Sequence, residues 1–451
     1  MSGGGDSGAT EAGMERPTRV RHRVLAGLCL AAALAYLCRN VVAVAESTLR
    51  NDLGLTKQES GWLMSAFFFS YALGQIPCSS LGMRFGPRRV LPALAALWSA
   101  ATLAAAFVSG LAWAACWRVV QGLAQAGLFP TTTLCLARWI PQSDRATATG
   151  WLTSFMSLGG ALCAWLTGWM LEWLDPRVAP GWNWRITFLV ISMPGLIWAV
   201  VFWRWFRDHP REHGAVNAAE IRRIRPEGET LGSEAGEGLA QGARVNPGGT
   251  PWRTLAGSAT LWWICLQQAC RAAGYIFFAS WFATYLQETR GVGVAKSGFL
   301  NMLPLLAVVG GSLVGGGVSD LIWRRTRSLA RARCGLSAGS LIGCAVLIFL
   351  SKSLQDPLSA VLVISAGSFL AGLASPCAYA LTIDLGGSHT TTVNATMNMM
   401  GNLGAWAFPI VVPWILERFG GWDAVLWAFG GLHLMAAAAW MMVRTDRPVV
   451  A

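Results

Sequence analysis

Twelve stretches of mostly apolar residues decide what this chain can fold into. A helix of about 20 such residues crosses the hydrocarbon core of a bilayer. The twelve stretches lie near residues 24–45, 61–82, 90–109, 112–133, 147–171, 184–206, 260–287, 297–318, 334–351, 357–380, 391–416 and 422–442. None of them shows the sustained apolar/polar alternation of a transmembrane β-barrel. The pattern therefore predicts an all-α membrane protein with twelve transmembrane helices.

Composition supports this interpretation and excludes other classes of protein. Hydrophobic residues make up 54% of the 451 residues and charged residues 13%, whereas a soluble domain carries about 25% charged residues. This excludes a soluble enzyme, a disordered chain and a disulfide-stapled secreted module. The 11 Cys and five His show no metal-ligand spacing, and no nucleotide-binding loop occurs. We therefore expect neither an enzyme nor a protein with a cofactor.

The net charge of +12 is explained by topology. With the N-terminus in the cytoplasm, 24 of the 35 Lys and Arg residues fall on the cytoplasmic side and eight on the opposite side. Short cytoplasmic loops carry such an excess of basic residues, so both termini are expected in the cytoplasm. The charge forms no compact basic domain, which excludes a nucleic-acid partner.

One long polar interval divides the apolar stretches into six and six. An Arg pair follows the second stretch of each half, at Arg88-Arg89 and at Arg324-Arg325. Repeated halves are typical of secondary transporters, whose substrate site lies between the halves near the bilayer midplane. The predicted division is an N-terminal tail at 1–23, a six-helix bundle at 24–206, a cytoplasmic linker at 207–259, a second six-helix bundle at 260–443 and a C-terminal tail at 444–451.

An ordered set of motifs makes the pattern more specific. The motifs are Tyr36–Asn40 (YLCRN), Ser65–Pro77 (SAFFFSYALGQIP), Arg118–Pro130 (RVVQGLAQAGLFP), Gly181–Arg185 (GWNWR) and Asn398–Gly404 (NMMGNLG). Together they resemble the major facilitator superfamily, and within it the anion:cation symporter family, which includes sialin and bacterial sugar-acid transporters. The resemblance covers nearly the whole chain. It implies the major facilitator fold, with two six-helix bundles.

Three arginines, Arg39, Arg118 and Arg271, lie within apolar stretches. A charge at the bilayer centre costs about 2.5–3.5 kcal/mol on insertion scales. A guanidinium stays ionised and binds a carboxylate through two parallel hydrogen bonds. We therefore predict that Arg39 and Arg118 form an anion site, and the resemblance implies that both contact the substrate. The alternative, an Arg satisfied by backbone carbonyls, stays open, and the resemblance assigns no role to Arg271.

The resemblance and the helical spacing add further substrate-binding candidates. These are Tyr36, Tyr71, Gln125, Asn398, Asn402 and Ser375. Gln125 follows Arg118 by seven residues, which is two turns along the same helix face. A substrate hydroxyl would satisfy a buried phenol or amide, but so would a hydrogen bond to a neighbouring helix.

Two positions depart from the pattern of proton-coupled relatives. Gln125 stands where such relatives carry a proton-accepting Glu, and Cys38 stands where Asp is frequent. An amide cannot titrate, and a thiol in an apolar core stays neutral. The coupling ion, proton or sodium, therefore stays open, as do uniport and anion exchange.

The resemblance also implies a cytoplasmic gate after the second helix of each half. Its residues are Arg84, Arg88, Arg89, Asp320 and Arg324. The family places an Asp before the first of these basic residues, where it interacts with a neighbouring helix N-terminus. Met83 stands in that place here, whereas Asp320 is present in the second half. We therefore expect this interaction with a helix N-terminus only in the second half.

We predict a secondary active or facilitative transporter that moves a small organic anion, such as a sugar acid, by alternating access. Its partners are that anion, the lipid bilayer and a coupling ion, and we expect a monomer. Two alternatives stay open: an organic-anion sensor that does not transport, and an efflux carrier for amphipathic compounds, which the 24 Trp favour. Three Lys against 32 Arg suggests a GC-rich genome, so we expect the bacterial inner membrane.

Overall fold

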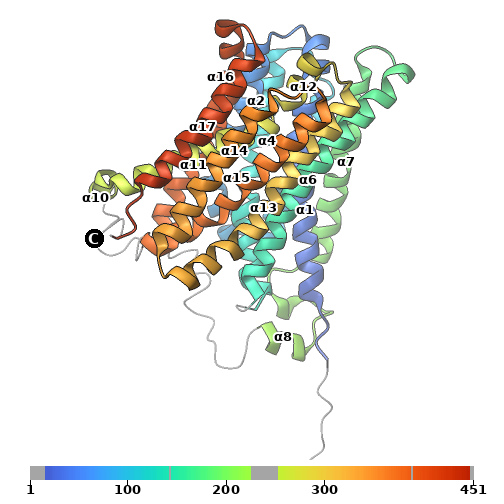
Figure 1. Cartoon of the computed structure of the whole chain (residues 1–451). Coiled ribbons are helices and arrows are strands. Elements are labelled where there is room, and N and C mark those ends of the chain that lie inside the picture. The colour runs from blue at the N-terminus through green and yellow to red at the C-terminus, as the bar shows by residue number, and fades with distance from the viewer. Residues whose placement is uncertain (1–15, 142–143, 225–251, 387–389, 447–451) are drawn as a thin grey trace, which may run out of the picture.

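Long helices make up nearly all of the structure (Figure 1). The computed structural model describes residues 16–141, 144–224, 252–386 and 390–446, which contain no β-strand. The helices of the N-terminal half are α1 (Val20–Leu53), α2 (Lys57–Phe85), α3 (Pro87–Ala105), α4 (Leu111–Ala126), α5 (Leu128–Trp139), α6 (Arg145–Leu174) and α7 (Trp182–Trp205). Those of the C-terminal half are α11 (Ala259–Phe278), α12 (Phe282–Arg290), α13 (Val294–Thr326), α14 (Leu336–Ser351), α15 (Pro357–Gly386), α16 (Thr390–Phe419) and α17 (Trp422–Met442).

The helices account for all twelve predicted membrane spans. Eight helical segments of the described residues are long and apolar enough to cross a membrane: α1, α6, α7, α13, α15, α16, α17, and α14 together with the π-helix Ala330–Gly335 that leads into it. The other four predicted spans correspond to α2, to α3, to α4 followed by α5, and to α11 followed by α12. The stretch 112–133 was thus predicted as one helix but is two, and so was the stretch 260–287.

The break between α4 and α5 has a cause in the sequence. Pro130 has no N–H, and its ring would clash with the carbonyl of Ala126 if the helix continued through this point. Instead α4 ends at Ala126, and a new helix begins at Leu128 with Pro130 in its first turn. Proline is tolerated there because the first N–H groups of a helix have no intrahelical partner.

A proline also explains a hydrogen bond beside the break between α11 and α12. Pro413 in α16 cannot donate to the carbonyl of Pro409 one turn earlier. The indole Nε1 of Trp281, which lies between α11 and α12, donates to that free carbonyl at 3.1 Å. Trp281 is fully buried, so this bond fixes the junction of α11 and α12 against α16.

Small residues let helices approach closely within each half. A Cβ on Gly159 of α6 would overlap the backbone of Ala33 in α1, and a Cβ on Gly311 of α13 would overlap the backbone of Phe369 in α15. Both glycines belong to the Gly-Gly pairs of the sequence, 159–160 and 310–311. Backbone contact of this kind takes the place of a hydrophobic driving force between helices in a bilayer.

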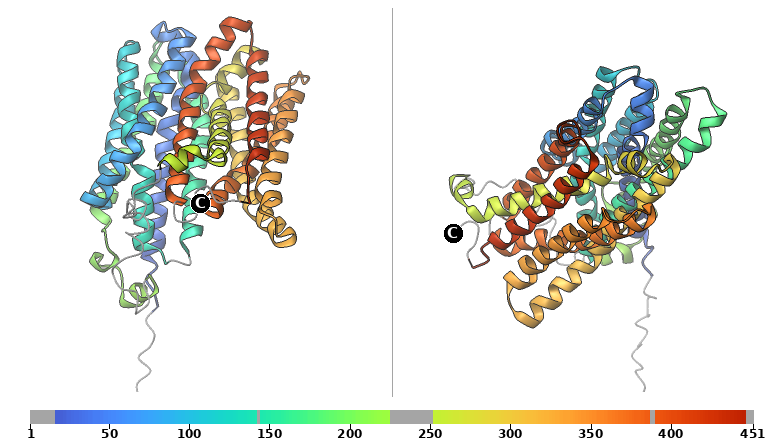
Figure 2. Two further views of the ribbon diagram at one scale, coloured as in Figure 1. Left: turned by 90° about the vertical axis from the view of Figure 1, so that its left-hand side faces the viewer. Right: turned by 45° about the horizontal axis from the view of Figure 1, so that its top comes forward.

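The two halves meet at one end of the molecule, which we call the closed end. It carries the turns from α1 to α2, from α12 to α13 and from α16 to α17. Helices α2 with α16, and α6 with α13, make the main contacts between the halves. In Figures 1 and 2 the opposite ends of the helices spread apart, and we call this the spread end.

The described part of the predicted linker at 207–259 contains the short α-helices α8 (Ala218–Ile224) and α10 (Trp252–Gly257) and a 3-10 helix at Pro210–Glu212. Residues 225–251 of this linker, 1–15 of the predicted N-terminal tail and 447–451 of the predicted C-terminal tail lie outside the described residues. The carboxylate of Glu220 in α8 is fully buried and accepts hydrogen bonds from the backbone N–H groups of Arg19 and Arg21. It also pairs with the Arg21 guanidinium at 3.1 Å, so α8 caps the start of α1 at the spread end.

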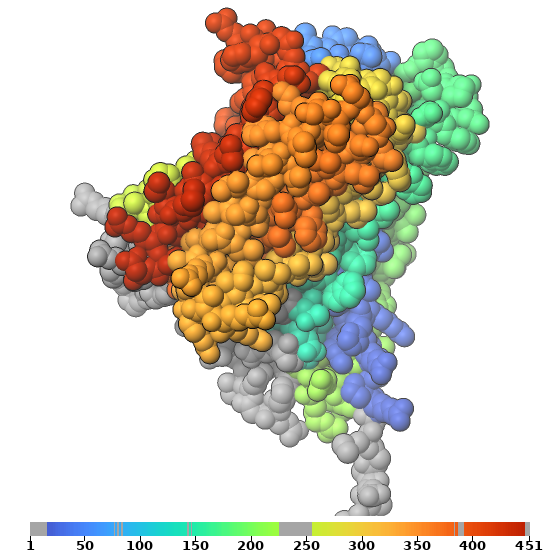
Figure 3. All heavy atoms as spheres, in the orientation of Figure 1, coloured from blue at the N-terminus to red at the C-terminus, as the bar shows by residue number. Residues whose placement is uncertain are grey.

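Large apolar side chains lie exposed around the outside of the bundle, as a lipid-facing surface requires. Examples are Trp113, Phe107, Leu313 and Trp414. In Figure 3 the first residues of α1, in dark blue, project beyond the C-terminal half at the spread end. The apolar exterior agrees with the predicted integral membrane protein.

The Gly310-Gly311 pair provides a matched stability test. Gly311→Ala should lower the melting temperature of the purified protein, by the equivalent of about 1–3 kcal/mol, because the new methyl group overlaps backbone atoms of α15. Gly310→Ala should have little effect, because its methyl group meets the Phe369 ring at an ordinary 3.6 Å. Thermal melts in detergent compare the two, and equal melting temperatures would contradict the close contact of α13 with α15.

Candidate functional site

Arg39 lies in α1 inside a cage of aromatic rings. Its guanidinium carbon is 4.5 Å from the ring centre of Tyr36, 4.6 Å from that of Phe67 and 4.7 Å from that of Tyr71. Its Nε donates to Oε1 of Gln125 at 3.2 Å. No carboxylate lies within ion-pair distance of Arg39 in the described part of the chain. The positive charge is therefore held by ring faces and an amide, and not by an acid.

Arg118 in α4 also faces the Phe67 ring, with its guanidinium carbon 4.7 Å from the ring centre, but its hydrogen bonds differ from those of Arg39. Its side chain is almost fully buried and donates to the carbonyls of Arg39 and Leu63, at 3.3 and 3.4 Å. It also donates to Oε1 of Gln121 at 2.7 Å. These bonds tie α4 to α1 and α2, and substrate contact by Arg118 stays a prediction.

Gln125 and Gln121 connect α4 to α1. Nε2 of Gln125 donates to the carbonyl of Ala35 at 2.9 Å, while its Oε1 accepts from Arg39. Gln121 lies one turn earlier and donates to the carbonyl of Cys38 at 2.9 Å. The sequence analysis missed Gln121, although its place three residues after Arg118 in an apolar stretch was a usable signal.

The second half has an arginine held in a similar way. In α11, Nε and Nη2 of Arg271 both donate to Oε1 of Gln268, at 3.3 and 2.9 Å, and Nη1 donates to the Ser375 hydroxyl at 3.2 Å. No acid within the described ranges pairs with Arg271. Each half thus contains an Arg that is oriented by a Gln and lacks a carboxylate partner.

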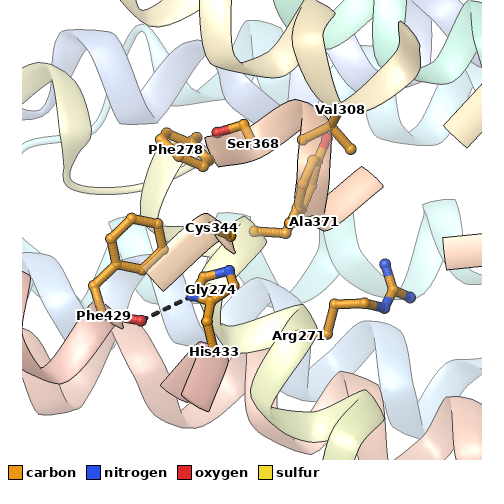
Figure 4. Close-up of a pocket in the computed structure, with 10 residues that line it drawn as sticks. Arg271, Gly274, Phe278, Val308, Cys344, Ser368, Ala371, Phe429 and His433 are labelled. Atoms are coloured by element: carbon orange, nitrogen blue, oxygen red, sulfur yellow. Dashed lines mark hydrogen bonds between the residues drawn. The ribbon is translucent and has the colours of Figure 1, made fainter. Parts of the chain in front are cut away.

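A small cavity of about 20 Å³ lies beside Arg271 within the C-terminal half. His433 and Tyr275 line it, and the ring of His433 shares a hydrogen bond with the carbonyl of Phe429 at 2.9 Å. Figure 4 shows the Arg271 guanidinium turned away from His433. The volume suits about one water molecule, so this cavity is too small for an organic anion.

Aromatic side chains lie between Arg39 of the N-terminal half and Arg271 of the C-terminal half. Phe67 and Phe68 of α2 form one buried cluster with Ile276 of α11 and Ala405 of α16. Tyr71 and Tyr275 pack against this cluster from opposite halves. Tyr71 contacts Arg39, and Tyr275 lies one helical turn from Arg271. Both arginines therefore border the same region between the halves.

The candidates on α15 and α16 lie in the C-terminal half. Ser375 contacts Arg271, as described above. Oδ1 of Asn398 accepts a hydrogen bond from the Tyr379 hydroxyl at 3.3 Å, and Nδ2 of Asn398 donates to Asn394 at 3.3 Å. Asn402 lies one turn further along α16 and is partly exposed. Substrate contact by these residues stays a prediction.

At the spread end, Asp208 and Arg333 organise the predicted gate residues. Asp208 accepts a hydrogen bond from the backbone N–H of Arg88 at 2.8 Å and lies 3.9 Å from the Arg138 guanidinium. Arg333 pairs with Asp320 at 3.0 Å and with Asp384 at 3.3 Å. The other predicted gate residues, Arg84, Arg89 and Arg324, are exposed. Asp208, Arg333 and Asp384 were not predicted, and the gating roles stay predictions.

These features define a class of protein: a helical membrane carrier made of two bundles, with positive charges in the region where the bundles meet. The chain belongs to the Major Facilitator Superfamily, whose profile matches residues 28–409. This confirms the predicted superfamily and the predicted fold of two six-helix bundles.

Curated relatives match over nearly their whole length. A probable sulfoacetate transporter of Cupriavidus necator is 30% identical over 430 residues, which is 95% of each chain. A D-galactonate transporter of Escherichia coli is 29% identical, with 96% of this chain and 97% of the relative covered. A probable galactarate/D-glucarate transporter of Bacillus subtilis is 26% identical, with 94% and 91% covered.

Solved structures support the fold. A bacterial homologue of the human lysosomal transporter Spinster superposes with a TM-score of 0.71 at 20% identity, with 94% of both chains covered. The D-xylose-proton symporter gives a TM-score of 0.69 at 14% identity, with 94% and 98% covered. With the family and the relatives, this makes the chain a multi-pass membrane transporter of a small molecule, as predicted, and not an enzyme.

The two arginines of the N-terminal half should respond differently to the same substitution. Arg118→Lys should lower the melting temperature, because Lys cannot reach three acceptors at once and a lost hydrogen bond to a charged group costs about 1.5–3 kcal/mol. Arg39→Lys should melt close to wild type, because its charge rests on ring faces. Thermal melts compare the two variants. A larger drop in melting temperature for Arg39→Lys than for Arg118→Lys would mean that Arg39 contributes more to stability than Arg118.

Proposed function

We propose that this transporter carries a small organic anion, a hydroxylated carboxylate such as a sugar acid, by alternating access. The observation that carries the proposal is the pair Arg39 and Arg271. One lies in each half, each is held by a Gln, and both border the region between the halves. The relatives that match the chain are named as transporters of sulfoacetate and sugar acids, which supports the same substrate class.

The physical reason is the cost of leaving these charges unpaired. A guanidinium in a membrane protein needs a compensating group, and within the described residues neither Arg39 nor Arg271 has a carboxylate. A substrate carboxylate supplies the missing charge. Because the two arginines belong to different halves, an anion between them attracts both halves towards itself. Binding then favours a state in which the site is enclosed.

The remaining site candidates fall into two groups. We propose that Arg118 and Gln125 hold Arg39 in position, because both are almost fully buried and bonded to α1. Tyr36, Tyr71, Ser375, Asn398 and Asn402 are proposed to meet the hydroxyl groups of the substrate. Their phenol, hydroxyl and amide groups both donate and accept hydrogen bonds.

We place the spread end in the cytoplasm and the protein in a bacterial inner membrane, as a monomer. The excess of basic residues in the loops at that end supports this orientation. The gate residues Arg84, Arg88, Arg89, Asp320 and Arg324 then face the cytoplasm. We propose the domain division 24–206 and 260–443, with the linker and both tails on the cytoplasmic side.

Coupling to a proton by the usual residues is not expected. Cys38 is fully buried, with its sulfur 3.8 Å from the carbonyl of Ile191, and Gln125 is bonded on both sides of its amide. We therefore propose that a proton is not carried through residues 38 and 125. Sodium coupling, exchange and uniport are the alternatives.

The arginine pair provides a binding test. Arg39→Lys and Arg271→Lys should each weaken binding of the best carboxylate by about tenfold or more, because a Lys point charge cannot form two parallel hydrogen bonds. Thermal shifts against sulfoacetate, galactonate, glucarate and glucuronate measure the affinity. Arg290→Lys is the matched control, since this residue donates to loop carbonyls outside the site. Unchanged affinity in both site variants would remove the pair from the site.

Proteoliposomes test coupling and separate a transporter from a sensor. Uptake of the labelled anion should occur. An imposed pH gradient should not drive this uptake by way of residues 38 and 125. An inward proton gradient that produces strong accumulation, and still does so after Glu46, Glu172 and Asp384 are neutralised, would contradict this account of coupling. Binding without any uptake would favour the sensor.

A further inference from the structure

We propose that Glu46 is a positioning residue of the gate at the closed end, and that it acts by holding Arg50 towards the C-terminal half. This inference rests on the transporter class and on the contacts between the halves. It does not depend on which anion is carried. It assigns a role in alternating access to a carboxylate that the substrate site does not use.

Glu46 is one of two buried carboxylates in the described residues, and the other, Glu220, caps α1 at the spread end. Oε1 of Glu46 pairs with Nε of Arg50 at 2.8 Å, one turn along α1. Oε2 accepts a hydrogen bond from the Thr284 hydroxyl of α12 at 2.7 Å. The carboxylate therefore joins a residue of its own helix to a residue of the opposite half.

The ion pair continues across the boundary between the halves. Nη2 of Arg50 lies 3.5 Å from Oε1 of Glu288 in α12, and the amine of Lys57 in α2 lies 2.7 Å from Oε2. Trp422 at the start of α17 donates to the same Oε2 at 2.9 Å. The charges alternate along the row Glu46, Arg50, Glu288 and Lys57. Three of them belong to the N-terminal half, and Glu288 is the one that the C-terminal half contributes.

The hydrogen bonds seen between the two halves, among the described residues, are grouped towards the closed end. Beside the ion row, Ser47 donates to Gln287 at 2.6 Å and the N–H of Ala295 donates to Glu172 at 3.0 Å. Deeper in the molecule, Ser65 donates to the carbonyl of Trp406 at 2.7 Å. Opening the closed end must therefore break the contacts of Glu288 and Thr284 with α1 and α2.

Within this network Glu46 determines where Arg50 points. Without it, Arg50 is free to turn towards solvent, because its side chain is still 18% exposed and the Glu288 contact is long. Solvent-exposed ion pairs contribute little, partly because two long side chains must be held in one geometry. Glu46 already holds Arg50, which lowers this entropy cost for the pair of Arg50 with Glu288. Neutralising Glu46 should therefore shift the population towards the state with this end open.

A disulfide reports how often the end is closed. Ser47→Cys with Gln287→Cys places one thiol on each side of the boundary between the halves, at two positions whose present side chains touch. Because a Cys side chain is shorter than that of Gln, the disulfide forms only when α1 and α12 approach each other at least as closely as in the closed state. The parent also carries Cys78→Ser and Cys116→Ser, which remove the two cysteines that are not buried. Mild oxidation of the purified full chain is followed over time, and the 47–287 disulfide is quantified by mass spectrometry of unreduced peptides.

We expect Glu46→Gln to slow disulfide formation at least threefold. Thiol chemistry predicts the opposite change, because losing a neighbouring negative charge favours the reactive thiolate. Glu59→Gln is the matched control, since Glu59 is an exposed acid of the same end that bonds to Thr56 at the start of its own helix. It should leave the rate unchanged. Equal rates for Glu46→Gln and Glu59→Gln would overturn the proposal.

Thr284→Val keeps the proposal testable if Glu46→Gln fails to fold. It removes the hydrogen bond between the halves and leaves the Glu46–Arg50 pair intact, so we expect a smaller slowing of disulfide formation, about twofold. Melting curves are recorded for every variant. A lower melting temperature with an unchanged disulfide rate would make Glu46 a structural residue only and would also overturn the proposal.

Discussion

The structure depends on how positive charge is accommodated in a membrane interior. Arg118 is satisfied by two backbone carbonyls and an amide, and its bonds hold α1, α2 and α4 together. Arg39 and Arg271 are each oriented by a glutamine and keep an uncompensated charge within the described structure. A buried charge without a partner is costly, and among the described residues Arg118 has no carboxylate partner either. Its bonds to backbone carbonyls of two neighbouring helices are the basis for the proposal that Arg118 positions Arg39, while Arg39 and Arg271 bind the anion.

Prolines have a complementary effect, because each leaves a backbone carbonyl without its usual partner one turn earlier. The carbonyl of Pro409, freed by Pro413, accepts from Trp281. The carbonyl of Gly372, freed by Pro376, accepts from the Ser312 hydroxyl of α13 at 3.3 Å. In both cases the free carbonyl bonds to a side chain of another helix. The prolines therefore connect helices within the C-terminal half.

The sequence was sufficient for the number and approximate position of the membrane helices, because hydrocarbon thickness fixes their length. It did not predict the break at Gly127, although Pro130 carried the signal. It identified Arg39 and Arg118 as candidates but could not predict their different hydrogen-bond partners, because these depend on which carbonyls the folded neighbours present. Asp208 and Arg333 were missed for the same reason: their partners lie on other helices and are brought close only by helix packing. Gln121 was missed although its partner Arg118 lies only three residues earlier.

Helix α1 connects the substrate region to the closed end. Arg39 and Glu46 are seven residues apart and share one face of this helix. The position of α1 is fixed at Arg39 by Arg118, which grips the Arg39 carbonyl, and at Glu46 by Thr284 of the opposite half. Under the proposed function, an anion that draws Arg39 towards Arg271 pulls the same helix towards the C-terminal half, which Glu46 and Arg50 already contact. Occupation of the proposed site and closure of this end then act on one helix, which links the two events as the rocking of one bundle against the other needs.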